Sequence, residues 1–216
     1  WLFVSSSGGL TAGRVSPDTA LFPYLPVDRI HESNPHTGCQ TILRVGRQGQ
    51  QVTWEPFNRQ HAGRFRTSCN LYKNVPGNKL CFEEVNHDLA LAFRYTWATS
   101  DRNGFVRRCE LRNLGDGTAR VELVDGLQNI LPAGTPLLVQ TNSSNLVDAY
   151  KWTELDAATG LGVYALYSRI SDRAEPAESL RANVVYGLGL EAPTVLLSSL
   201  QLDEFRLGRP VVQEDH

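Results

Sequence analysis

The sequence has little of what membrane and nucleic-acid partners require. None of its apolar stretches approaches the roughly 20 uninterrupted apolar residues of a membrane-spanning helix, and no basic segment precedes the apolar residues 1–4. Lysine and arginine number 21 against 23 aspartates and glutamates, which leaves a formal net charge of −2. Because no overall positive charge attracts phosphate backbones or anionic lipids, we predict neither nucleic acid nor a membrane as a partner.

The four cysteines, Cys39, Cys69, Cys81 and Cys109, form no Cys-x-x-Cys pair. The five histidines match no common metal-binding spacing either, so we predict no metal site. Buried free thiols are the favoured interpretation, and they slightly favour the cytoplasm. Cys69 and Cys81 lie almost symmetrically about a turn at residues 76–78, however, where a cross-strand disulfide would form in an oxidising compartment. The cysteines therefore do not decide between a reducing and an oxidising compartment.

Methionine is absent, and the sequence begins with Trp1. A chain without a start methionine is expected to be part of a longer protein. Hydrophobic residues make up 41% and charged residues 20% of the 216 residues, which is the composition of a folded domain. All-β sandwiches of roughly 200 to 250 residues occur as single units. We predict one domain over residues 1–216.

Alternation of large and small side chains predicts strands along most of the chain. The clearest is Leu89–Trp97, where every second residue is large and apolar, so that these side chains form one row on one face. Turn residues at 76–78, 103–104 and 133–134 separate several of the segments. Many short strands with such spacing favour a large antiparallel β-sandwich. Further strands are predicted at residues 40–45, 51–54, 64–72, 79–85, 104–114, 118–131, 162–170, 180–187 and 193–199.

A hairpin with a three-residue loop at residues 115–117 is predicted between the strands on either side. This loop length sets Leu111 opposite Val121, so that apolar side chains share a face, whereas a two-residue loop would mix the faces. The same register brings Arg112 diagonally opposite Glu122, within reach of an ion pair. The last glycine of the loop is expected to supply the positive φ that such hairpins commonly need.

Two segments depart from the strand pattern. Residues 145–152 follow a polar run and predict one short helix, with Ser144 or Asn145 capping its first turn. Residues 17–38 contain four prolines and predict an extended loop.

Catalytic motifs are absent from the sequence. It contains no Gly-x-Ser-x-Gly elbow, no phosphate loop and no His-Glu-x-x-His helix. Adjacent strand residues point to opposite faces, so Glu83 and Glu84 do not both face one substrate. We interpret these two, together with Asp88, Glu122 and Asp125, as solvated charges on strand faces, and we assign no catalytic residue.

Aromatic side chains suit sugar binding because a flat apolar ring matches the C–H face of a pyranose. Trp54, Trp97, Tyr150 and Trp152 are the candidates. Trp97 belongs to the apolar row and is expected in the core. Trp152 and Tyr150, at the edge of the short helix, are the better surface candidates, although a packing role competes with binding.

Two stretches carry a resemblance to a known family. The first is Asn70-Leu71-Tyr72-Lys73-Asn74-Val75-x-Gly77-Asn78-Lys79 with Phe82-Glu83-Glu84, and the second is Val124-Asp125-Gly126-Leu127-Gln128-Asn129-Ile130-Leu131-Pro132. They resemble the N-terminal domain of cellobiose phosphorylase-like glycoside phosphorylases and hydrolases. The resemblance implies a β-supersandwich of the galactose mutarotase-like kind, followed in the same protein by a helical catalytic barrel.

What the resemblance implies is a non-catalytic domain that supports the barrel and the substrate cleft of a carbohydrate-active enzyme. The implied partners are an oligosaccharide or polysaccharide, the helical catalytic domain and a second copy in a homodimer, and no cofactor is expected. A stand-alone carbohydrate-binding module and an aldose epimerase-like enzyme remain as alternatives. The expected carbohydrate-binding residues are Trp152, Tyr150, Trp54, Asp125, Gln128 and Asn129.

Overall fold

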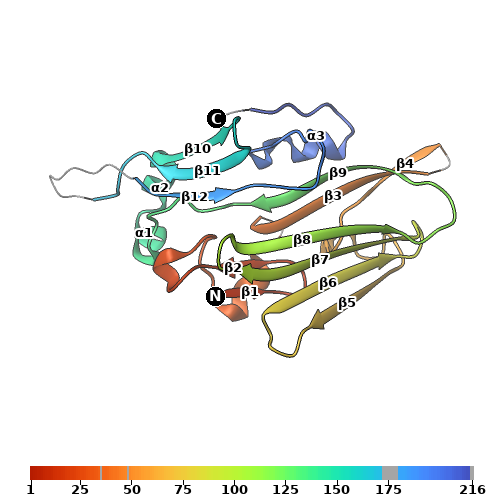
Figure 1. Ribbon diagram of the computed structural model, residues 1–216, viewed down its shortest axis with the longest axis horizontal. Helices are drawn as coiled ribbons and strands as arrows, with labels where there is room; N and C mark the ends of the chain where they lie inside the picture. The colour runs from red at the N-terminus through yellow and green to blue at the C-terminus, as the bar shows by residue number, and fades with distance from the viewer. Residues whose placement is uncertain (35, 48, 172–179, 215–216) are drawn as a thin grey trace. The chain divides into compact units, whose positions relative to one another are not determined.

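The computed structural model describes residues 1–34, 36–47, 49–171 and 180–214. Strands dominate, and they form several antiparallel sheets with only short helices between them (Figure 1). The predicted all-β, sandwich-like fold class is therefore confirmed. The chain forms two compact units: unit 1 comprises Trp1–Gln40 and Asp125–His216, and unit 2 comprises Thr41–Val124. In the described ranges, no helix is long and apolar enough to cross a membrane.

A four-stranded antiparallel sheet forms much of unit 2. Its strand order, β5-β6-β7-β8, follows the chain, so each strand reverses into its neighbour. The turns predicted at residues 76–78 and 103–104 lie at two of these reversals. Gly77 and Gly104 adopt φ values of +74° and +68° there, which glycine tolerates because it has no Cβ. The strands are β5 (Thr67–Lys73), β6 (Lys79–Asn86), β7 (Leu91–Ser100) and β8 (Gly104–Asn113).

The predicted apolar row is buried on one face of this sheet. Leu91, Phe93, Tyr95 and Trp97 alternate along β7, and none is more than 3% exposed. The ring of Phe82 on β6 stacks on that of Tyr95, with centroids 5.0 Å apart. The row therefore forms the core of unit 2.

A second sheet packs against this row. It contains β3 (Gly38–Arg47), β4 (Gln50–Trp54) and β9 (Arg120–Gln128) in the order β4-β3-β9. The indole Nε1 of Trp54 donates to Glu84 on β6 over 2.8 Å. Arg107 on β8 donates to Thr41 on β3 over 3.1 Å. These hydrogen bonds join the facing sides of the two sheets, which is the arrangement of a β-sandwich.

The hairpin predicted around residues 115–117 is wrong. β8 pairs with β7, so that Leu111 lies opposite Phe93, whereas β9 pairs with β3 in the other sheet. The connecting residues therefore pass from one sheet to the other, held by a hydrogen bond from the Leu114 amide to the Ala90 carbonyl over 2.8 Å. Alternation determines which side chains share a face, but it does not determine which strand lies alongside.

The Cys69–Cys81 disulfide is also wrong. The register of β5 and β6 places Cys69 opposite Glu84 and Cys81 opposite Tyr72, so the two cysteines are not neighbours. All four cysteines are thiols rather than disulfides, which confirms that part of the favoured interpretation, but the expectation of burial is wrong, because Cys69 is exposed and the other three are half-buried. Although the two cysteines are almost equally far from the turn in the sequence, the register of β5 and β6 does not place them opposite each other.

Unit 1 contains two small antiparallel sheets. One joins β1 (Leu2–Val4) to β2 (Leu10–Ala12), and the other has the order β10-β11-β12. The strands of the second sheet are β10 (Lys151–Asp156), β11 (Leu161–Leu166) and β12 (Ala182–Val185). The sequence pattern predicted β11 and β12 but missed β1, β2 and β10. The strand predicted at residues 193–199 is wrong, because no strand forms there.

The helices are short throughout the described part of the chain. Residues 17–38 are not merely an extended loop, since they contain two 3₁₀ helices and bury Phe22 and Ile30. The helix predicted at residues 145–152 is confirmed over residues 145–150 as part of α2, but residues 151–152 begin β10 instead. The N-cap of α2 is Ser143, whose side chain makes no capping hydrogen bond. The helices are η1 (Pro17–Thr19), η2 (Val27–Glu32), η3 (Arg59–His61), α1 (Leu137–Asn142), α2 (Ser144–Tyr150), η4 (Ser199–Gln201) and α3 (Leu202–Arg206).

Candidate functional site

The β10–β12 sheet presents two faces of different character. Trp152 lies opposite Ala165, which lies opposite Ala182 on the third strand. The next pairing on the same side joins Glu154 to Val163 and Val184. Residues directly opposite in an antiparallel sheet share a face. We call this side the aromatic face, defined by Trp152, Glu154, Val163, Ala165, Tyr167, Ala182 and Val184.

The other face of the sheet is directed into unit 1. Leu155 and Leu166 are 8% and 2% exposed, and the Asn183 amide donates to the Leu131 carbonyl over 2.7 Å. Burial raises the pKa of Tyr164 on this side. Because the inner face is packed, the aromatic face is the side of the sheet that is left to solvent.

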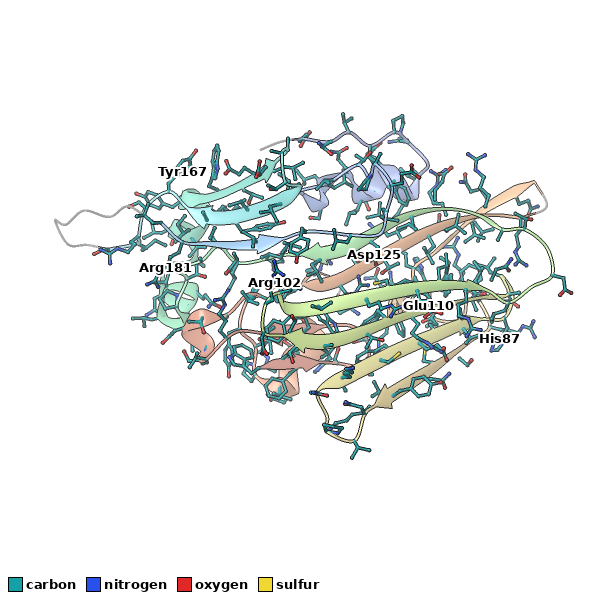
Figure 2. All side chains as sticks on the ribbon, in the orientation of Figure 1. His87, Arg102, Glu110, Asp125, Tyr167 and Arg181 are labelled. Carbon is teal, nitrogen blue, oxygen red and sulfur yellow. The ribbon has the colours of Figure 1, made fainter. Side chains whose placement is uncertain are left out.

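Trp152 and Tyr167 are the two aromatic residues of the aromatic face. Their ring centroids are 4.8 Å apart, and the ring planes are inclined at 52°. Tyr167 is 62% exposed (Figure 2), and the half-buried Trp152 donates from Nε1 to Glu154 over 2.8 Å. The hydrogen bond fixes the indole, so the pair offers a fixed ring beside an accessible one.

Tyr150 adjoins this pair through the backbone. It ends α2, is 43% exposed, and its carbonyl accepts from the Tyr167 amide over 2.9 Å. Lys151 pairs with Asp148 over 2.5 Å, and this hydrogen bond lowers the pKa of Asp148. Of the expected carbohydrate-binding residues, the structure thus brings Trp152 and Tyr150 together.

The other four expected binding residues lie elsewhere. Trp54 is 1% exposed in the core of unit 2, so its ring is covered by protein. Asp125 and Gln128 are half-buried on β9, and Gln128 donates to Gln40 over 3.4 Å. Asn129 adopts φ +58° and donates to the Thr37 hydroxyl over 2.8 Å.

Glu83 and Glu84 point to opposite faces of their sheet, as expected, but the prediction that both are solvated is wrong. Their exposures are 7% and 6%. Glu84 faces the core, where it accepts from Trp54 Nε1 and from the Phe57 amide over 2.7 Å. Although Cys69 is exposed as a residue, partial desolvation of its thiol, followed by the nearby Glu84 carboxylate, raises the pKa of Cys69 to about 11. This thiol is therefore protonated at neutral pH.

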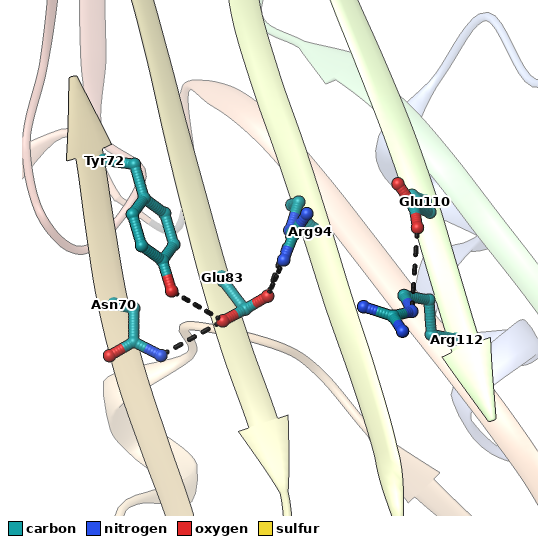
Figure 3. A network of polar contacts seen from close by, with 6 residues as sticks. All are labelled: Asn70, Tyr72, Glu83, Arg94, Glu110 and Arg112. Carbon is teal, nitrogen blue, oxygen red and sulfur yellow. Dashed lines mark hydrogen bonds and ion pairs between the residues drawn. The ribbon is translucent and has the colours of Figure 1, made fainter. Parts of the chain in front are cut away.

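Glu83 lies in a polar network on the opposite face (Figure 3). It pairs with Arg94, and it accepts from Asn70 and from the Tyr72 hydroxyl, each over 3.1 Å. The hydrogen bond from Arg94 is the main reason that the pKa of Glu83 is lowered. A carboxylate held ionised and fully hydrogen-bonded is suited to orienting its neighbours rather than to transferring protons.

Tyr167 was not among the residues predicted from the sequence. A signal was present, because Val163, Ala165 and Tyr167 alternate within the strand predicted at residues 162–170. The strand β10 was missed, however, so no partner strand placed Trp152 on the same face. Among the described residues, no group of three or more His, Cys, Asp or Glu side chains is arranged to hold a metal ion.

Comparison with known proteins gives no family for this chain. No protein-family model matches the sequence, and no curated protein matches it either.

Proposed function

We propose that this chain is a non-catalytic sandwich domain of a carbohydrate-active enzyme and that its aromatic face binds oligosaccharide. The observation that carries the proposal is the pair formed by half-buried Trp152 and exposed Tyr167 on one face of a sheet. The apolar C–H face of a pyranose gains contact area on such rings, and the adjacent Glu154 carboxylate supplies an acceptor for sugar hydroxyls.

The remaining surface of the aromatic face supports the same ligand class. Val184 is 52% exposed, and its neighbours Ala182 and Ala165 are small, so no bulky side chain on these strands projects from that part of the face. A face with small side chains on neighbouring strands leaves room for an extended chain of sugars beside the two rings. The resemblance to cellobiose phosphorylase-like proteins suggests β-linked glucans as the first ligands to test.

The test is a titration of the full chain with cellohexaose and with laminarihexaose, followed by tryptophan fluorescence and calorimetry. We expect saturable binding that changes the emission of the partly exposed Trp152. The variant Tyr167→Ala is expected to bind about tenfold more weakly, because the loss of about 1 kcal/mol from the aromatic contact adds to the loss of buried apolar area.

Tyr167→Phe is the matched control, since it keeps the ring and removes only the hydroxyl. We expect it to bind as the wild type does. Phe3→Ala removes an exposed ring from β1, outside the aromatic face, and is expected to change nothing. A folded wild-type chain that binds no neutral oligosaccharide at millimolar concentration would overturn the proposal.

A further inference from the structure

A second set of polar side chains lies on the outer face of the β5–β8 sheet, on the side away from the buried row. Antiparallel register places Asn70, Glu83, Arg94 and Glu110 in one row across the four strands. We call this side the polar face. The row beside it consists of Tyr72, Cys81, Thr96 and Arg108.

A shallow hollow of about 190 Å³ lies between these two rows and is lined by Cys81, Arg94, Thr96, Arg108 and Glu110. The side chains of Cys81 and Thr96 are short, whereas the others are long and charged. The bottom of the hollow is therefore formed by short side chains and its sides by charged ones. Its volume is below the roughly 300–1,000 Å³ of clefts that enclose drug-sized ligands. The size suits one sugar ring or one charged substituent.

Not every charged side chain around the hollow has a partner of opposite charge. Arg94 is neutralised by its pair with Glu83, and Arg112 lies 3.8 Å from Glu110. Arg108 is exposed, and its guanidinium makes no hydrogen bond or ion pair within residues 1–34, 36–47, 49–171 and 180–214. Three arginines therefore face two glutamates, which leaves one positive charge in excess.

An unpaired guanidinium at the wall of a polar hollow has a definite chemical preference. Its planar fork matches the two oxygens of a carboxylate, and the resulting charge-assisted hydrogen bonds are about twice as strong as neutral ones. The Thr96 hydroxyl and the Glu110 carboxylate, beside it, match the hydroxyl groups of a sugar. A ligand that combines one carboxylate with several hydroxyls satisfies both requirements.

We propose that the polar face binds a uronic acid residue of an acidic oligosaccharide, with Arg108 pairing with its carboxylate. Glu110 and Thr96 hydrogen-bond the ring hydroxyls. The Glu83 network holds Arg94 in place at the wall of the hollow. This site lies in unit 2 and does not depend on the function proposed for the aromatic face of unit 1.

The experiment titrates the full chain with β-1,4-linked triglucuronate, with its neutral counterpart cellotriose, and with inorganic sulfate. Nuclear magnetic resonance of the Arg108 and Thr96 backbone amides reports where each probe binds. We expect triglucuronate to bind at these amides at least about tenfold more tightly than cellotriose and sulfate do. Arg108→Ala is expected to remove that preference, and Arg108→Lys to restore part of it.

Arg102→Ala is the matched control, because it removes the same charge from the exposed turn between β7 and β8 (Figure 2). An equal loss in Arg102→Ala and Arg108→Ala would overturn the site, since it would indicate attraction by overall charge. Sulfate that binds as tightly as triglucuronate would overturn the assignment to a sugar. Tyr167→Ala must leave triglucuronate binding at the polar face unchanged, which separates this site from the aromatic face.

Discussion

At the scale of single residues, Glu84 is a buried carboxylate that joins separate parts of the core of unit 2. Its two carboxylate oxygens accept from the indole of Trp54 and from the amide of Phe57. Phe57 adopts φ +64°, a conformation that is rare for residues other than glycine. The hydrogen bond to its amide helps to hold the backbone in that conformation.

Replacing Glu84 is expected to destabilise the chain markedly. Glu84→Ala leaves two donors without an acceptor, and we expect a loss of about 3 kcal/mol in the free energy of unfolding. Glu84→Gln keeps one acceptor and should lose about half as much. Urea unfolding followed by tryptophan fluorescence measures both, with the exposed Glu110→Ala as the control. A change below about 0.5 kcal/mol in Glu84→Ala, the range typical of surface sites, would contradict this role.

The burial of Glu84 was not predictable from the residues around it. Carboxylates on strands are usually solvated, and the acceptor role depends on Trp54, which lies 30 positions away. Trp54 itself was expected to bind sugar and is instead covered in the core. Both errors have the same cause, because neither residue's partner is near it in the sequence.

At the scale of elements, alternation predicted most strands and their faces, including the buried row of β7. It did not predict which strands pair, because any antiparallel neighbour with the same alternation satisfies the pattern. The connection between β8 and β9 illustrates the limit: its glycines indicated a tight reversal, and the chain instead passes between two sheets. The aromatic face was found only in part for the same reason, since β10 was not predicted.

A double-mutant cycle distinguishes the two pairings of β9. In the structure Glu122 pairs with Arg44 on β3 over 2.8 Å, whereas the predicted hairpin would have paired it with Arg112. We expect a coupling energy of about 0.5–1 kcal/mol between Arg44→Ala and Glu122→Ala, because this arginine is mostly buried. Arg112→Ala and Glu122→Ala should be additive. Coupling in the second cycle and none in the first would contradict the observed sheet.

At the scale of the whole molecule, unit 2 is a continuous stretch with its own core. Trp54, Tyr95 and Trp97 are among the side chains that fill it. We expect residues 38–128, which include all of β3 and β9, to fold when expressed alone. Cooperative urea unfolding and a near-ultraviolet dichroism signal from the buried rings would be the readouts. A broad transition with no such signal would contradict an independent core.

The two ends of this stretch lie close together because the strands that carry them are neighbours. β3 and β9 are adjacent in their sheet. Gln40 and Gln128, which flank residues 41–124 on either side, contact each other. The chain therefore enters and leaves unit 2 at one place. A segment whose two ends adjoin can be lengthened, shortened or exchanged for another segment with little change in the distance that the flanking chain must span. The place where the chain enters and leaves unit 2 is therefore suited to recombination, whether natural or engineered.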